Sequence, residues 1–126
     1  TLDINAELED RVRAYFKESE YHHKIDFRIG AAKQLIPQIN EAWDLVFIDA
    51  DKTNYLNYYE MVITSLKSGG YVIADNVLWS GKVVDHKMDD ADTVALREFN
   101  DFISTDSRVE VVLLPVRDGL MIARKK

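Results

Sequence analysis

The chain has 126 residues, a formal net charge of -6 and no cysteine, and 47% of its residues are hydrophobic. This length and apolar share suit one domain with a core of its own. The acidic balance argues against a nucleic-acid backbone as partner. No disulfide framework is possible, so we expect a cytoplasmic protein, and no apolar run approaches the ~18 residues that a membrane span needs.

The first third of the chain predicts two strands, each followed by a helix. Thr1–Ile4 reads as the last turn of a strand, and Asn5 is a good N-cap for the helix that follows. Ile25–Ile29 alternates apolar and polar residues, as a strand does. Ala31–Asn40 is a short helix that Pro37 must kink or restart. Because the chain opens with Thr1 directly inside an element, we interpret it as a piece of a longer chain.

The remaining two thirds continue the alternation and then close with a hairpin. The expected elements are a strand over Asp44–Asp49, a helix capped by Thr53 and ended by Gly69-Gly70, a strand over Tyr71–Ala74, a long loop over Asn76–Asp92, a helix from Asp92 to Thr105, and strands over Val109–Val116 and Leu120–Arg124 joined through Asp118-Gly119. Alternating strands and helices predict an α/β fold with a mostly parallel sheet and helices on both faces. The hairpin adds an antiparallel strand.

Oxygen-bearing side chains follow two of these strands. Asp49 ends one apolar run, and Asp75 and Asn76 end the next. Open α/β sheets bind ligands at the carboxyl ends of their strands, and these three donors suit Mg²⁺, Mn²⁺ or Ca²⁺. Lys52, three residues after Asp49, could serve as a general base beside a bound cation. The simpler alternatives are carboxylates that cap helices and a lysine that is only solvated.

Other candidates carry weaker signals. Asp3 ends a strand before a helix, where an acid binds ribose hydroxyls in dinucleotide folds. Gly30, Ala31 and Ala32 would let a ligand approach the backbone, although an ordinary strand-to-helix turn has the same residues. Trp79 and the tyrosines could form a wall for a flat substrate, but aromatic residues are more often core.

Three segments together resemble the cation-dependent, S-adenosylmethionine-dependent O-methyltransferases, in particular the caffeoyl-CoA and bacterial branch. Asp49–Tyr55 is similar to the family's DADK-x-x-Y segment, Asp75–Gly81 to its DN-x-L-W-x-G segment, and Leu114–Leu120 to its closing LP-x-x-DGL hairpin. The catechol O-methyltransferases have a further glutamate before the last hairpin, where this chain has Val111–Leu113.

The resemblance implies a Rossmann-like class I methyltransferase fold and a role for each candidate. In that family, the matching residues bind the divalent metal (Asp49, Asp75, Asn76), act as the base (Lys52), bind S-adenosylmethionine (Asp3, Gly30, Ala31, Ala32, Asp49) and lie on the substrate side (Tyr55, Trp79). The expected reaction is methyl transfer to a small aromatic substrate with catechol-like, vicinal hydroxyl groups.

The resemblance also implies that residues 1–126 form the C-terminal portion of a single O-methyltransferase domain. The family's first strand, its glycine-rich cofactor loop and its N-terminal helices would precede Thr1. We therefore expect the full-length protein to be a homodimer and this piece alone to be inactive. Two alternatives stay open: a receiver-type signalling domain, and an inactive methyltransferase-fold remnant that only binds partners.

Overall fold

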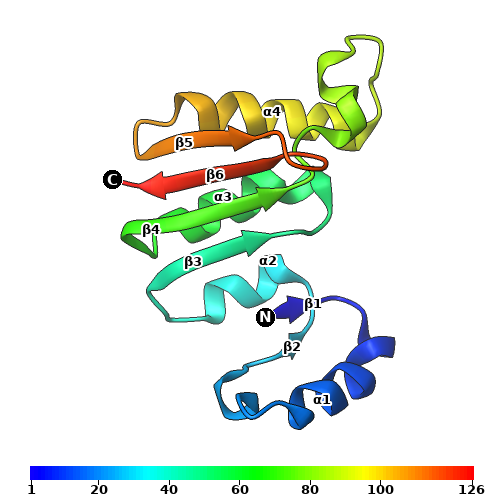
Figure 1. Ribbon diagram of the computed structural model, residues 1–126, viewed down its shortest axis with the longest axis vertical. Helices are drawn as coiled ribbons and strands as arrows, with labels where there is room; N and C mark the ends of the chain where they lie inside the picture. The colour runs from blue at the N-terminus through cyan, green and yellow to red at the C-terminus, as the bar shows by residue number, and fades with distance from the viewer. The chain divides into compact units, whose positions relative to one another are not determined.

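The computed structural model describes residues 1–126, which divide into two compact units, Thr1–Asn40 and Glu41–Lys126 (Figure 1). The sequence-based prediction that they belong to one domain stays a prediction. No helix in either unit has the length and apolar character that crossing a membrane requires.

The first unit is built on a two-stranded parallel sheet. Its elements are β1 (Leu2–Asp3), the 3₁₀ helix η1 (Ala6–Leu8), α1 (Glu9–Glu18), η2 (His22–Lys24), β2 (Arg28–Ile29), α2 (Ala32–Leu35) and η3 (Ile36–Gln38). The side chain of Asn5 accepts a hydrogen bond from the Glu7 amide, which confirms it as an N-cap. η3 begins at Ile36 directly after α2 and has Pro37 in its first turn, so the helix restarts at Pro37 as predicted.

The second unit contains a four-stranded sheet with the order β3-β4-β6-β5. Its elements are β3 (Trp43–Ile48), η4 (Lys52–Asn54), α3 (Tyr55–Ile63), β4 (Leu66–Asp75), η5 (Trp79–Val84), α4 (Ala91–Thr105), β5 (Val109–Leu114) and β6 (Leu120–Lys125). β3 and β4 are parallel, and β6 runs antiparallel to both β4 and β5. The predicted closing hairpin is therefore confirmed.

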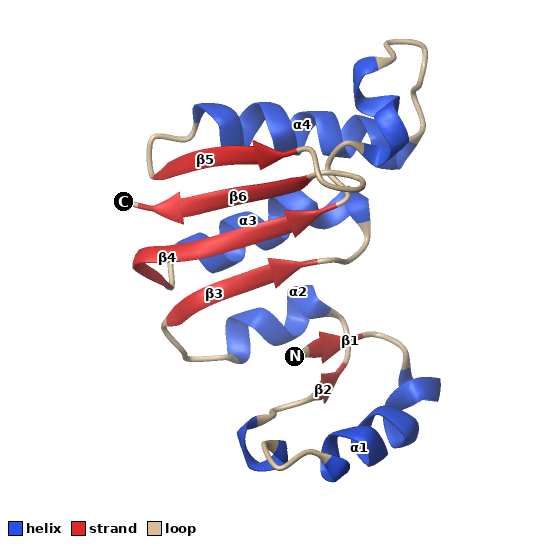
Figure 2. Cartoon of the chain, viewed as in Figure 1, coloured by secondary structure: helices blue, strands red, loops and turns tan.

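Both helices of the second unit lie on the same face of its sheet (Figure 2). Phe99 of α4 packs edge-on against Tyr55 and Tyr59 of α3, and all three are fully buried. The opposite face exposes apolar side chains, among them Leu45 and Phe47 of β3. Within this unit, helices therefore cover only one face of the sheet, whereas helices were predicted on both faces.

Some element boundaries differ from those expected. β4 begins at Leu66 rather than at Tyr71, because Gly69-Gly70 lies inside the strand instead of ending the helix. Thr53 lies inside η4 and caps nothing. The N-cap of α4 is Asp90 rather than Asp92, and its carboxylate accepts hydrogen bonds from both the amide and the hydroxyl of Thr93.

Candidate active site

The parallel pairing of β3 with β4 brings two acidic residues to one edge of the sheet. Ile48 is in register with Ala74, so the next residues, Asp49 directly after β3 and Asp75 at the end of β4, lie side by side. β3 and the Tyr71–Ile73 part of β4 are rich in β-branched and aromatic residues, which favour extended structure. The backbone therefore brings the carboxyl ends of β3 and β4 together, as predicted.

Lys52 is at the centre of this edge. It opens η4 and is only 7% exposed. Its ammonium donates to Asp49 Oδ1 at 3.4 Å, to Asn76 Oδ1 at 3.3 Å and to the hydroxyl of Tyr55. An ammonium has three donor hydrogens, and each has an acceptor. Because a buried charge is costly unless it is paired, this arrangement holds Lys52 in one position.

The oxygen donors Asp49, Asp75 and Asn76 are of the chemical type that a hard divalent cation binds. Asp49 Oδ1 and Asn76 Oδ1 both contact Lys52 Nζ, so their separation cannot exceed the sum of 3.4 and 3.3 Å. Two oxygens that share Mg²⁺ at ~2.1 Å each lie at most ~4.2 Å apart, and this upper limit is compatible with such a separation. The Asp75 carboxylate accepts a hydrogen bond from the Asn76 backbone amide at 2.7 Å through Oδ1, which leaves its second oxygen for a ligand. No three His, Cys, Asp or Glu side chains of the chain form a metal cluster. A metal site at this edge therefore needs the side-chain oxygen of Asn76 as a third ligand.

Tyr55 supports Lys52 from inside the protein. Its side chain is fully buried, and its hydroxyl donates to the Asp75 carbonyl at 3.0 Å while it accepts from Lys52. Burial, and next the charge of Asp49, raise the pKa of Tyr55 far above its ordinary value, so the hydroxyl stays protonated. A contact between Tyr55 and a substrate stays a prediction that this burial does not favour.

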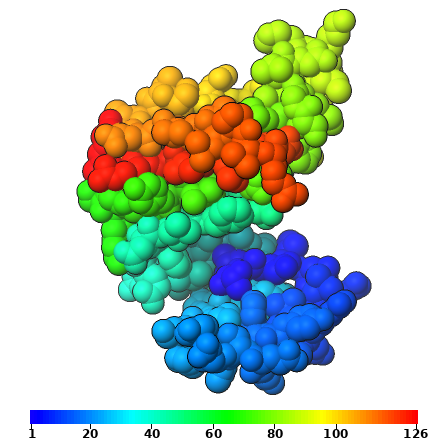
Figure 3. All heavy atoms as spheres, viewed as in Figure 1, coloured from blue at the N-terminus to red at the C-terminus, as the bar shows by residue number.

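Trp79 forms a second aromatic wall beside Lys52. The Lys52 ammonium lies 4.5 Å from the centre of the Tyr55 ring and 5.7 Å from that of Trp79, within the range of cation–π attraction. The indole Nε1 of Trp79 is buried without a hydrogen-bond partner. Trp79 belongs to the segment between β4 and α4, which extends beyond the end of the sheet (Figures 1 and 3).

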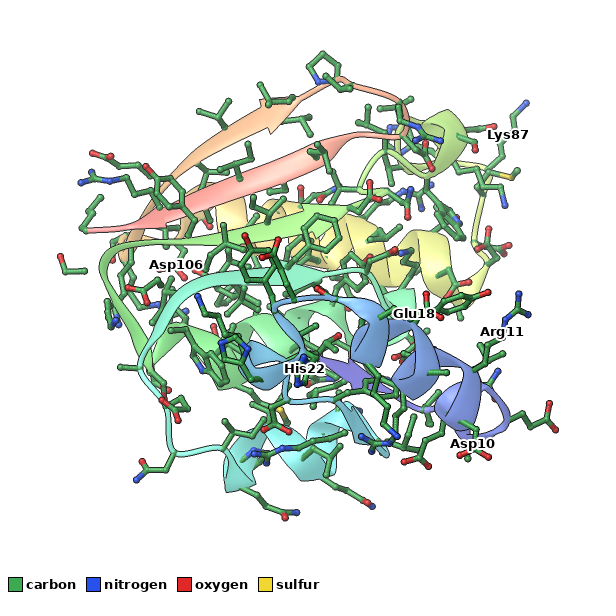
Figure 4. The ribbon with its side chains drawn as sticks, turned by 60° about the horizontal axis from the view of Figure 1, so that its bottom comes forward. Asp10, Arg11, Glu18, His22, Lys87 and Asp106 are labelled. Atoms are coloured by element: carbon green, nitrogen blue, oxygen red, sulfur yellow. The ribbon has the colours of Figure 1, made fainter.

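The sequence did not single out Arg97, which anchors this segment to α4. Its guanidinium donates to the main-chain carbonyls of Lys82, Val83, Asp85 and Met88. In Figure 4, Lys87 lies beyond one end of α4 and Asp106 beyond the other. An arginine at a helical position gives no sign in the sequence of such backbone contacts, because exposed helix arginines have the same spacing.

The predicted cofactor residues of the first unit gather at the carboxyl end of its sheet. Asp3 ends β1 and is in register with Ile29, and the Gly30 amide donates to the Asp3 carbonyl at 2.8 Å. Gly30 has a φ of +149°, and a Cβ atom there would approach Leu35 Cδ1 to 3.2 Å. Ala31 is the N-cap of α2 and Ala32 its first residue. Asp49 belongs to the second unit.

Comparison with known proteins assigns the family. The family model described as O-methyltransferase matches residues 1–126. The chain belongs to the O-methyltransferase family. The receiver-domain alternative is therefore not supported. A caffeoyl-CoA O-methyltransferase of Medicago sativa is 36% identical to this O-methyltransferase chain, and the match covers 98% of the chain and 55% of the relative. A probable caffeoyl-CoA O-methyltransferase 2 of Dictyostelium discoideum is 37% identical, with 98% and 56% covered.

Solved structures agree with this O-methyltransferase assignment. The O-methyltransferase from Bacillus cereus in complex with SAH superposes with a TM-score of 0.91 at 28% identity, over 100% of this chain and 61% of that one. The SAH-bound methyltransferase PaMTH1 of Podospora anserina gives 0.88 at 27% identity, over 100% and 59%. The Rossmann-like methyltransferase fold is thereby confirmed. The chain spans about half the length of the curated relatives that it matches.

Proposed function

We propose that this chain carries the catalytic edge of a divalent-metal-dependent O-methyltransferase that uses S-adenosylmethionine and acts on an aromatic substrate with vicinal hydroxyl groups. The observation that supports it most is the convergence of Asp49, Asn76 and Lys52 at the ends of two parallel strands. The named relatives are caffeoyl-CoA O-methyltransferases, and caffeoyl-CoA carries two adjacent hydroxyl groups.

Lys52 would remove the proton from the attacking hydroxyl group. Its Nζ is held between an acidic and an amide oxygen at the sheet edge, so its position is fixed before a substrate arrives. The ammonium would first release one proton to solvent, and the neutral amine would then accept the substrate proton along one of the three directions in which it now donates. Tyr55 keeps the amine in place because its own hydroxyl is anchored on the Asp75 carbonyl. Orientation of this kind supplies much of the acceleration in a transfer reaction.

Asp49, Asp75 and Asn76 would hold the cation, and Asp3 with Gly30–Ala32 would bind the cofactor. When bound, the cation would stabilise the substrate oxyanion and the cofactor would supply the methyl group as an electrophile. Asp49 is the most accessible of these three predicted metal ligands, because its side chain is 55% exposed while Asp75 and Asn76 are half-buried. The homodimer expected from the resemblance and the cytoplasmic location expected from the absence of cysteine remain part of this proposal.

The test is methyl transfer by the purified full-length protein, of which residues 1–126 are expected to be a piece, from S-adenosylmethionine to caffeoyl-CoA, with Mg²⁺ and with excess chelator. We expect product with the cation only, and none from an analogue that has a single hydroxyl group. Lys52→Arg keeps the positive charge, but an arginine is not deprotonated in proteins. The rate should therefore fall by roughly 10²–10⁴, the usual contribution of a general base.

Lys67→Arg is the matched control, because Lys67 pairs with Asp44 on the surface and takes no part in the site. It should turn over as the unmodified protein does. Turnover that is insensitive to the chelator would refute the metal site. Binding of S-adenosylmethionine with no transfer to any vicinal diol would favour the inactive remnant instead.

A further inference from the structure

The turn between β5 and β6 contacts the segment that carries Asn76 and Trp79. The Val77 amide donates to the Gly119 carbonyl at 3.2 Å, and the Leu78 amide donates to the Asp118 carbonyl at 2.9 Å. The side chain of Asp118 adds a third bond, because its Oδ1 accepts from the Ser80 amide. Two adjacent residues of the turn thus bind three amides within four residues of the metal-site segment.

The segment needs such support because its backbone is unfavourable. Asn76, Trp79 and Ser80 have φ values of 57°, 49° and 54°, in the left-handed region that residues other than glycine rarely adopt. Conformations of this kind persist only when the surrounding structure enforces them. Within the segment, the Trp79 amide donates to the Asn76 carbonyl at 3.2 Å, and the Gly81 amide donates to the Leu78 carbonyl at 2.9 Å. The bonds from the turn add to these two local bonds.

Gly119 permits the close approach. Its φ is +85°, and a Cβ atom there would lie 2.5 Å from Leu78 Cγ, closer than any real contact. The turn therefore contacts Leu78 directly. In the sequence, Leu78 lies between the predicted metal ligand Asn76 and Trp79. On the other side, Asn100 of α4 donates to the Val77 carbonyl at 2.9 Å.

We infer that Asp118 is a positioning residue, whose carboxylate fixes the Ser80 amide and so holds Trp79 and Asn76 against Lys52. The inference rests on the proposed function for the role of Asn76, but the placement of Trp79 can be measured without activity. Removal of the carboxylate should release Ser80 from its left-handed conformation, and Trp79 should then move away from the Lys52 ammonium.

The experiment uses the fluorescence of Trp79 together with the affinity for Mn²⁺. The chain has only two tryptophans, Trp43 and Trp79, so Trp43→Phe leaves Trp79 as the single emitter. In that background we expect Asp118→Ala to shift the emission to longer wavelength and to weaken Mn²⁺ binding by roughly tenfold. Asp118→Asn keeps an acceptor oxygen and should restore most of both signals.

Asp89→Ala is the control, because Asp89 is an exposed carboxylate in the same segment and its removal changes the net charge equally. It should leave emission and affinity unchanged. If Asp118→Ala does not fold, as judged by thermal unfolding, Asp118→Ser replaces it, because serine suits turns but is too short to reach the Ser80 amide.

The inference is overturned if the Asp118 variants match Asp89→Ala, or if Asp118→Asn behaves as Asp118→Ala does. Failure of the proposed function would look different. In that case the unmodified protein would bind no Mn²⁺, while the change in Trp79 emission would still follow the acceptor at position 118.

Discussion

At the scale of single residues, the site depends on buried polar groups that satisfy one another. Lys52 has three acceptors, and one of them, the hydroxyl of Tyr55, itself donates a hydrogen bond to the Asp75 carbonyl. The chain Lys52–Tyr55–Asp75 therefore joins η4, α3 and the end of β4. Spacing alone indicates that Tyr55 lies one turn after Lys52, but it does not show that the hydroxyl points toward the strand.

We expect Tyr55→Phe to lower the free energy of unfolding by about 1–3 kcal/mol, because the Lys52 ammonium and the Asp75 carbonyl would both lose a buried partner. Urea unfolding followed by circular dichroism measures the difference. Tyr15→Phe is the matched control, since Tyr15 is 58% exposed and should change stability by less than about 0.5 kcal/mol. Equal stability of the two variants would contradict the structural role of the Tyr55 hydroxyl.

At the scale of elements, strand ends were easier to predict than helix ends. The apolar runs before Asp49 and Asp75 define β3 and β4, and their parallel pairing follows from the alternation of strands and helices. Gly69-Gly70 looked like a helix end because glycine is common there, yet it lies within β4. The contact of Gly119 with Leu78 was not predictable, since it depends on two segments that are far apart in the sequence.

The connection between α4 and β5 shows how one carboxylate can join two elements. Asp106 accepts from Tyr59 of α3 at 2.8 Å, and Arg108 bonds to both Asp106 and Glu60. The hydrogen bond from Arg108, which outweighs the effect of burial, lowers the pKa of Asp106 from 3.8 to about 2. The folded state therefore binds a proton at Asp106 less readily than the unfolded chain does.

Because the pKa of Asp106 is lower in the folded state, its contribution to stability is present above about pH 4 and is lost as the pH falls toward 2. We expect Asp106→Asn to lower stability at pH 7 by an amount on the order of 1 kcal/mol, reduced because Arg108 is partly exposed. Urea unfolding at several pH values should show the difference shrinking below pH 4. A difference that is constant from pH 7 to pH 2 would contradict this pKa assignment.

At the scale of the whole molecule, the core is unevenly divided between the two units. The buried hydrophobic side chains lie in Glu41–Lys126 except for Phe27, which packs edge-on against Phe16 in the first unit. The first unit has a sheet of two residues per strand, and its helix α1 has no buried residue. Hydrophobic burial is the main favourable contribution to folding, so the two units should differ in local stability.

We therefore expect amides of Thr1–Asn40 to exchange with deuterium faster than those of the second unit, because local opening free energies follow the buried apolar contacts of each region. Within the second unit, β4 and β6 have a neighbour on both sides and should exchange most slowly, while the edge strands β3 and β5 should be intermediate. Mass spectrometry of peptides after timed exchange resolves these regions. Equal protection of peptides from α1 and from β6 would show that the first unit opens only when the whole chain unfolds. The first unit would then be more stable than its single buried hydrophobic residue indicates.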